Sequence, residues 1–268
     1  MSVRLRPLVL LGILVLVLMA LSPWLAGLDP LKISVAERLK PPSARHFFGT
    51  DDFGRDVFAR VAHGARLSLW IGLLVAGFAT LLGTAIGLAA GFFRRADPFL
   101  ARLVDALMAF PDILLAVALM AAFGSNLGNV VVALGLVYAP RVARVVRAST
   151  FAQRSTLFVE AAVSMGASDL RILLVHVLPN ILPVLFVQAT FVFAYALLTE
   201  SALSFLGVGV PPEVPTLGNM IAASQLYFDD ATWMILFPGL AIALAVLSLQ
   251  LVGDGLRDSL DPVLRSAQ

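Results

Sequence analysis

Few side chains in this chain have the types and spacing that catalysis requires. A phosphate-binding loop has the form G-x-x-x-x-G-K-[ST], and neither of the two lysines, Lys32 and Lys40, follows a Gly. The three histidines, His46, His63 and His176, lack metal-ligand spacing, the chain has no cysteine, and no G-x-S-x-G elbow is present. The sequence therefore predicts no active site, no metal or cofactor held by this chain, and no nucleotide hydrolysis of its own.

Three carboxylates stand out because apolar sequence surrounds them. Glu200 lies seven residues before Gly207, where the apolar segment ends, so a regular helix would place it about 10 Å below that end. An ionised carboxylate at the centre of a membrane helix costs on the order of 3 kcal/mol. Glu200 should therefore face the interior of a helical bundle or a water-filled cavity. Asp105 is predicted to be an interfacial charge and Asp112, directly after Pro111, to cap or solvate a kink; a functional role of either is the alternative.

The surrounding sequence is that of a membrane protein. Hydrophobic residues make up 60% of the 268 positions and charged residues only 13%, whereas soluble domains carry about a quarter charged residues, and the mean hydropathy is +0.94. A helix needs about 20 apolar residues to cross the hydrocarbon core. The uncharged windows between residues 6 and 29 and between residues 66 and 94 predict two spans, and ranges 180–206 and 231–252 predict two more. The first window also fits a signal peptide, although it is longer than the usual core of about 7 to 15 residues.

The middle of the chain is predicted to hold two further spans. Residues 113–140 are uncharged, but the turn-forming residues of 124–129 divide them. The first of the two helices must then begin near Phe99 to be long enough, and the second runs from about Val130 to Val146. The prediction is therefore an all-α, polytopic fold with six transmembrane helices.

Basic residues set the orientation, because they remain on the cytoplasmic side of short loops. Seven basic residues between positions 32 and 66 fall in the first external loop, where acidic residues offset them, and the other external loops hold none. We therefore predict that both termini are cytoplasmic. On this prediction the cytoplasmic segments hold twelve arginines: Arg4, Arg6, Arg94, Arg95, Arg102, Arg141, Arg144, Arg147, Arg154, Arg171, Arg257 and Arg265.

The longest cytoplasmic segment, residues 148–179, is predicted to form two short amphipathic helices. Apolar residues recur at helical spacing on both sides of Gly166, where the backbone is unrestricted. Ser168 or Asp169 can cap the second helix, and Pro179 ends it or kinks it into the next span. The apolar faces need to be buried, either on lipid headgroups or against a partner protein.

Several motifs resemble one known family. E-A-A-V-S-M-G at 160–166, with L-P at 178–179, resembles the "EAA" loop of permease subunits of ATP-binding-cassette importers. G-T-D-D-F-G-R-D at 49–56 resembles the external-loop signature of the dipeptide, oligopeptide and nickel branch of that family, E-S-A-L-S-F-L-G at 200–207 is similar to the end of its fifth span, and 253–262 to its C-terminal tail. Four matches occur in the same order, which identifies the chain as a member of that branch.

The resemblance implies a type I importer permease with a definite division of the chain. Residues 1–28 would form the N-terminal transmembrane helix and residues 29–66 an external loop. Residues 67–254 would form a five-helix core that includes the coupling loop 148–179, and residues 255–268 a cytoplasmic tail.

The resemblance also implies partners. A second homologous permease, two cytoplasmic ATPase subunits that bind ATP and Mg, and an external solute-binding protein would join this chain in the bacterial inner membrane, in contact with lipid and without nucleic acid. The substrate would be a di- or oligopeptide, with nickel or another small solute as the alternative. Two rival interpretations are an ion-gradient-driven secondary transporter that uses Glu200 or the two aspartates, and a membrane scaffold.

Asp112 and Glu200 are candidates, from their apolar surroundings, for the translocation path or a subunit interface, where Glu200 would be a hydrogen-bonded structural residue. The resemblance assigns further site residues. The residues implied in coupling to the ATPase are Glu160, Ala161, Ala162, Gly166, Ser168, Asp169, Leu178 and Pro179.

Overall fold

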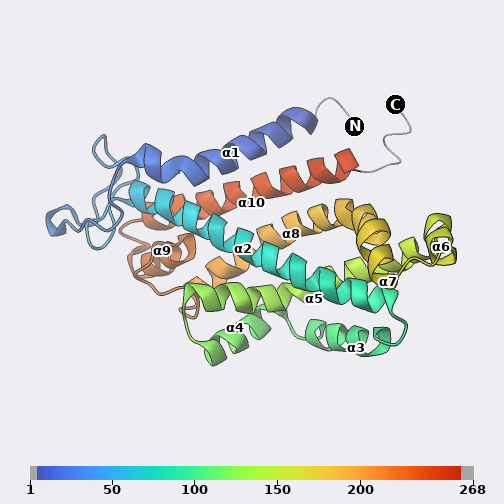
Figure 1. Cartoon of the computed structure of the whole chain (residues 1–268). Helices are drawn as coiled ribbons and strands as arrows, with labels where there is room; N and C mark the ends of the chain where they lie inside the picture. Colours follow the sequence, from blue (N-terminus) through green and yellow to red (C-terminus); the bar gives the residue numbers. More distant parts are fainter. Residues whose placement is uncertain (1–4, 261–268) are drawn as a thin grey trace.

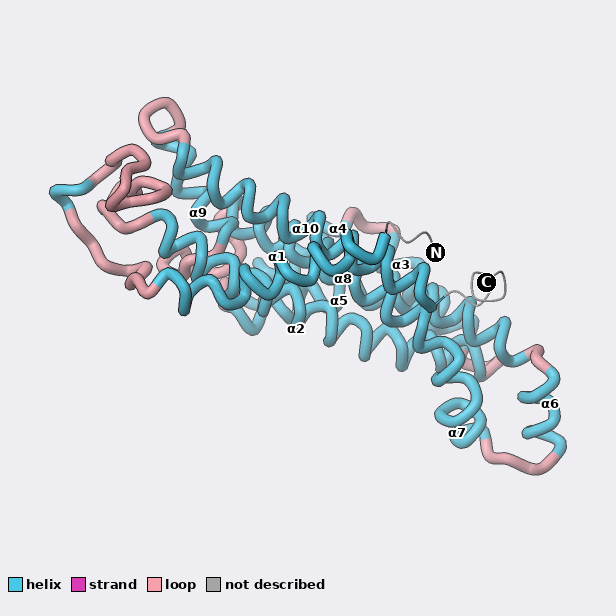
Figure 2. The backbone as a smooth tube through the Cα atoms, turned by 90° about the horizontal axis from the view of Figure 1, so that it is seen from above, coloured by secondary structure: helices cyan, strands magenta, loops and turns pink. Residues whose placement is uncertain are grey.

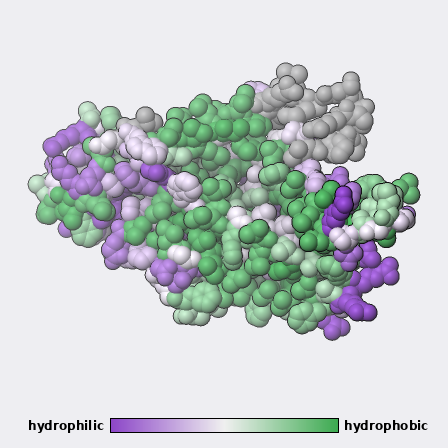
Figure 3. Space-filling model, viewed as in Figure 1, coloured by the Kyte–Doolittle hydropathy of each residue, from purple (hydrophilic) through white to green (hydrophobic). Residues whose placement is uncertain are grey.

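The computed structural model describes residues 5–260 and is a bundle of long helices. Within those residues, five helices are long and apolar enough to cross a membrane. In Figure 1 they run side by side, and the space-filling view of the same face shows a broad belt of hydrophobic side chains with polar residues gathered toward the two ends (Figure 3). The five are α1 (Leu5–Ala26), α2 (Val57–Phe92), α5 (Leu127–Arg154), α8 (Leu178–Phe205) and α10 (Trp233–Leu260).

The third predicted span is broken rather than continuous. In place of one helix from near Phe99, the structure has α3 (Asp97–Met108) and α4 (Asp112–Phe123), which are bent by 93° relative to each other. Pro111 occupies the position before α4, and its ring disfavours a helical conformation at the residue that precedes it. Each half is only about 18 Å long, so a sixth crossing exists only if the bent pair is counted as one span.

Two other long helices extend beyond the uncharged windows. α2 begins at Val57, because the side chain of Asp56 caps it by accepting a hydrogen bond from the Ala59 amide at 2.9 Å. α5 continues to Arg154, which places Arg141 in the middle of a helix. The charge of Arg141 therefore does not end the helix, and its assignment to a cytoplasmic segment stays a prediction.

The closest helix packing joins α2 to α5. Gly83, Gly87 and Gly91 lie four residues apart on one face of α2, and a Cβ atom at any of them would come within 2.6 Å of α5. Small residues at this spacing let two helix backbones approach closely in a membrane. α2 and α8 instead leave an apolar hollow of about 660 Å³ between them.

The connections gather at the two ends of the bundle (Figure 2). One end, called here the α9 end, carries the segment 27–56 and the short helix α9 (Leu217–Ser224). The opposite end, called the α6 end, carries α6 (Leu157–Ser164) and α7 (Asp169–Arg171). Sequence analysis did not predict α9. The sequence signal for it is Thr216, whose hydroxyl caps the helix at the Asn219 amide.

Candidate functional site

The loop around α6 turns at Gly166, as predicted. Gly166 has a φ of +80°, and its amide donates to the Val163 carbonyl at 2.9 Å while the Ala167 amide donates to the Ala162 carbonyl at 3.1 Å. This hydrogen-bond pattern is the usual way in which a glycine in the left-handed region ends a helix. The chain direction after α6 therefore depends on the backbone conformation of Gly166.

The second predicted helix of the loop is not separate from the next span. One helical stretch runs from Asp169 to Phe205 and includes a π-helical turn at Ile172–Val177. The helix therefore does not end at Pro179, and Figure 1 shows it turning where α7 approaches α8. Ser168 occupies the N-cap position, but its hydroxyl makes no capping hydrogen bond; its carbonyl accepts one from the Ile172 amide at 2.9 Å. Leu178 is half-buried and Pro179 is exposed.

The residues of the E-A-A motif face in different directions. Ala162 is 2% exposed and belongs to a small apolar cluster with Phe92, Val159 and Leu173. Glu160 and Ala161 are exposed, and large apolar side chains nearby are more exposed still, with Met165 at 82%. Ala162 thus packs α6 mainly against the turn at Ile172–Val177, with Phe92 at the end of α2 in the same cluster, while exposed apolar side chains of α6 remain uncovered.

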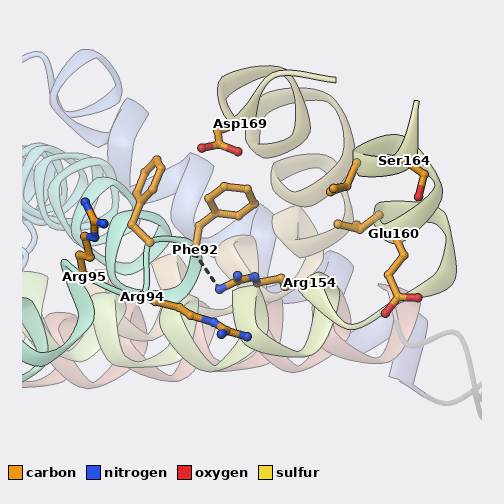
Figure 4. A pocket seen from close by; sticks show the side chains of 10 residues that line it. Phe92, Arg94, Arg95, Arg154, Glu160, Ser164 and Asp169 are labelled. Atoms are coloured by element: carbon orange, nitrogen blue, oxygen red, sulfur yellow. Dashed lines mark hydrogen bonds between the residues drawn. The ribbon is translucent and has the colours of Figure 1, made fainter. Parts of the chain in front are cut away.

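A hollow of about 630 Å³ separates α6 from the end of α2 (Figure 4). Arg94 and Arg95 line one side of it, and Asp169 and Glu160 line the other. Arg154 donates to the Phe92 carbonyl at 2.9 Å, and its guanidinium lies 5.7 Å from the centre of the Phe92 ring. Glu160 points away from Arg154 in Figure 4.

Glu200 is fully buried within this chain. Its carboxylate accepts hydrogen bonds from the Ser204 hydroxyl at 2.9 Å and from the Ser68 hydroxyl of α2 at 3.3 Å. Ser68 also accepts from the Leu217 amide at the start of α9, at 3.4 Å. Glu200 therefore joins three helices at the α9 end, an arrangement that fits the hydrogen-bonding interpretation better than contact with a solute.

Substitution of Glu200 should reveal whether hydrogen bonding is its role. Glu200→Gln keeps one acceptor oxygen and a similar shape, and its amide NH2 can donate to the other serine hydroxyl, so we expect it to be tolerated. Glu200→Ala leaves buried hydroxyls without partners and should lower the free energy of unfolding by about 1–3 kcal/mol. Thermal unfolding in detergent measures both, with Glu213→Ala as an exposed control. An unchanged melting temperature for Glu200→Ala would show that the hydrogen bonds of Glu200 do not stabilise the fold.

Three ion pairs join α5 to the bent pair of helices. The arginines are three residues apart on α5, and each pairs with an aspartate of α3 or α4. Sequence analysis did not predict this pairing, although the regular spacing of the arginines was a usable signal. The pairs are Arg141–Asp112 and Arg144–Asp105, both at 2.8 Å, and Arg147–Asp97 at 2.5 Å.

The Asp112–Arg141 pair lies beside two tyrosine rings, whereas the Arg147 guanidinium of the Asp97 pair lies 5.1 Å from one phenylalanine ring, that of Phe151. The Arg141 guanidinium lies 5.8 Å from the ring centre of Tyr138 on α5 and 5.1 Å from that of Tyr195 on α8. The Tyr138 hydroxyl is hydrogen-bonded to the Thr199 hydroxyl at 2.6 Å. Residues from α4, α5 and α8 thus meet at one place.

A second charged cluster lies at the α9 end. Asp51 is 4% exposed and accepts hydrogen bonds from the amides of Phe53 and Arg55 at 2.9 Å and from Arg55 Nε at 2.7 Å. Its second oxygen is also 3.4 Å from Arg60, which is 3% exposed. The next residue, Asp52, has a buried oxygen without a hydrogen bond, and its burial, followed by the charge of Asp51, raises the pKa of the Asp52 carboxyl.

A helical bundle with five or six membrane crossings and a turned helical loop at one end defines a class of membrane permeases. The chain belongs to the family described as the inner membrane component of binding-protein-dependent transport systems, whose sequence profile matches residues 79–266. Members of this family are transport components rather than enzymes, and they function with a partner permease, ATPase subunits that bind ATP and Mg, and a binding protein.

Relatives cover nearly the whole chain. A di/tripeptide transport system permease protein, DppC, of Pseudomonas aeruginosa is 44% identical over 96% of this chain and 88% of its own length. A dipeptide transport system permease protein, DppC, of Alkalihalophilus pseudofirmus is 42% identical over 91% and 81%. A glutathione transport system permease protein, GsiD, of Pectobacterium atrosepticum is 40% identical over 95% and 86%.

A solved structure has the same fold. The methionine transporter MetNI, an ATP-binding-cassette transporter in an inward-facing conformation, matches with a TM-score of 0.62 over 78% of this chain and 96% of its own. The two sequences are 19% identical, so the similarity concerns the fold. The predicted all-α importer permease fold is thereby confirmed, and the chain is a multi-pass protein of the inner membrane.

Proposed function

We propose that this chain is the permease subunit of an ATP-driven importer of short peptides and forms half of its translocation path. One observation carries the proposal: relatives that are 40–44% identical over at least 91% of the chain are named for dipeptides, di/tripeptides and glutathione. In this proposal a second homologous permease completes the path, two ATPase subunits supply energy, and an external binding protein delivers the peptide.

We propose that the α6 loop couples this chain to an ATPase subunit. Its exposed residues, Glu160, Ala161 and Met165, supply a surface for docking, while buried Ala162 transmits movement of α6 to the end of α2. Gly166 and the stretch from Ser168 to Pro179 connect the same movement to α8. Nucleotide binding by the ATPases would then favour one of two arrangements of the bundle.

The proposal requires the α6 end and both termini to be cytoplasmic, which labelling can test. Because the chain has no native cysteine, single cysteines at exposed positions report on sidedness directly. An impermeant maleimide added to intact spheroplasts should label Val35→Cys, at a site that is 78% exposed, and should label Ser168→Cys only after lysis. External labelling of Ser168→Cys would reverse the orientation and remove the α6 loop from reach of an ATPase.

Reconstitution tests the function itself. Liposomes that contain this chain, its partner permease and both ATPases should accumulate a radiolabelled dipeptide when binding protein and ATP are supplied. Collapse of ion gradients by ionophores should leave this uptake unchanged. Uptake that needs a gradient and no ATP would establish the secondary-transporter alternative, and ATP-dependent uptake of labelled nickel without peptide uptake would establish a different substrate.

A further inference from the structure

The Asp112–Arg141 pair lies within the depth of the hydrocarbon core. α5 has 28 residues and is therefore about 42 Å long, whereas the core is about 30 Å thick. Arg141 is about 21 Å from one end of this helix and about 20 Å from the other. If the core, about 30 Å thick, begins at either end of α5, Arg141 still lies inside it. Tyr195, whose ring centre lies 5.1 Å from the Arg141 guanidinium, is at a similar depth.

The pair does not face lipid, although it is accessible. The side chains of Arg141 and Asp112 are 36% and 41% exposed in this chain. Charged side chains at this depth almost always face the interior of a bundle or a water-filled cavity, because contact with lipid is costly. The face that carries the pair is therefore covered by protein or water in the assembled transporter.

The broken backbone beside Asp112 points to the same face. Residues 109–111 are non-helical and exposed, and Phe110 is 58% exposed. Non-helical backbone at membrane depth is tolerated only where it is buried in protein or lines a water-filled cavity. Asp112 is the first residue of α4 after this break, so the exposed backbone and the exposed ion pair adjoin.

We propose that Asp112 and Arg141, flanked by Tyr138 and Tyr195, form a contact site for the charged termini of a peptide in transit. A free peptide carries an ammonium group and a carboxylate. The Asp112 carboxylate can accept hydrogen bonds from the ammonium group, and the Arg141 guanidinium can donate to the carboxylate in the bidentate manner typical of arginine. The half-exposed ring of Tyr195 offers a face for a cation or an apolar side chain. This inference rests on the proposed function, since it assumes a peptide substrate.

The other candidates in the bundle do not share these features. Glu200 is buried, and its carboxylate already accepts hydrogen bonds from Ser68 and Ser204. The Asp97–Arg147 pair lies close to the end of α5, and the Asp105–Arg144 pair, although more exposed at 66% and 53%, has no tyrosine over its guanidinium. Asp105–Arg144 therefore serves as a matched control of the same chemistry, with its arginine on α5 and its aspartate on α3 instead of α4.

Paired neutral substitutions separate substrate contact from folding. In the complete reconstituted transporter, Asp112→Asn with Arg141→Gln should retain assembly and the ATP hydrolysis that loaded binding protein stimulates. The number of dipeptides imported per ATP should fall at least about tenfold, the loss expected for one charge-assisted hydrogen bond. Asp105→Asn with Arg144→Gln should stay within about twofold of the wild type. Normal import by the Asp112 and Arg141 variant, or loss of assembly and hydrolysis together with import, would overturn the proposal.

A labelling readout tests the same site without relying on turnover numbers. Leu198 is 43% exposed and lies one helical turn from Tyr195, so Leu198→Cys places a thiol beside the site. During ATP hydrolysis a dipeptide that carries a maleimide on its side chain should modify Leu198→Cys, and excess plain dipeptide should protect it. Leu10→Cys, 66% exposed on α1, should not react. Equal reaction at both positions would contradict the site, whereas a wild-type transporter that moves no peptide would refute the proposed function and the site with it.

Discussion

Gly166→Val is expected to abolish coupling between ATP hydrolysis and transport while leaving the membrane helices assembled. No atom lies within 4 Å of a Cβ built at Gly166, so the substitution acts through the backbone alone. A β-branched residue at a φ of +80° costs on the order of 1–3 kcal/mol, and relief of that strain redirects the chain between α6 and α7. Co-purification of the ATPases and peptide-stimulated hydrolysis in liposomes measure the loss.

The chain contains a matched control for this experiment. Gly207 follows α8 at a φ of +76°, also has no atom within 4 Å of a Cβ, and makes the same pair of hydrogen bonds as Gly166. Gly207→Val should therefore introduce similar strain at the opposite end of the bundle and leave ATPase association intact. Gly166→Asn should retain most coupling, because Asn tolerates the left-handed region. If Gly166→Val and Gly207→Val lose coupling equally, the loop has no special role.

Asp51→Asn should destabilise the α9 end severely. The substitution removes the negative charge that faces buried Arg60 and leaves that guanidinium without compensation. Loss of one partner from a buried ion pair typically costs about 3–5 kcal/mol. We expect a marked fall in the melting temperature of the purified subunit and faster proteolysis of the segment 27–56. A melting temperature within a degree or so of the wild type would show that Arg60 is adequately solvated.

Asp52→Asn is the adjacent control and should behave differently. Because burial raises the folded-state pKa of Asp52 above its unfolded value, ionisation of this carboxyl disfavours the folded state as pH rises through that range. Removal of the charge should thus be neutral or stabilising at neutral pH, and any gain should fade in acid, where Asp52 is protonated in both states. Unfolding curves of Asp51→Asn and Asp52→Asn at two pH values measure the contrast.

The amino-acid sequence predicts the long helices well, because a membrane crossing requires a long run without charge. α1, α8 and α10 lie close to their uncharged windows. The prediction fails for the third span, because the run around Pro111 has suitable composition on both sides of the break. Hydropathy averages over a segment, whereas a 93° bend depends on the backbone of a few residues.

Some features of the candidate site residues could be predicted from local sequence, whereas others depend on how the helices pack. The turn at Gly166 follows from local chemistry, because only glycine readily adopts its φ, and the sequence predicts it. The burial of Glu200 and the meeting of Arg141 with Tyr195 depend on how α2, α5 and α8 pack, and no spacing along a single segment reports that. The three consecutive residues of the E-A-A motif likewise do not reveal that Ala162 is buried while Glu160 and Ala161 are exposed.

The glycine face between α2 and α5 limits how the bundle can move. With backbone atoms of α5 only 2.6 Å from where a Cβ would be at Gly83 and Gly87, neither helix can slide past the other without side chains colliding with the opposing backbone. The two helices should therefore travel as one lever, about 54 Å long along α2, whose far end receives the motion of α6. Opening and closing of the bundle must then occur where helices are less closely packed. The hollow of about 660 Å³ between α2 and α8 leaves room for these two helices to move relative to each other.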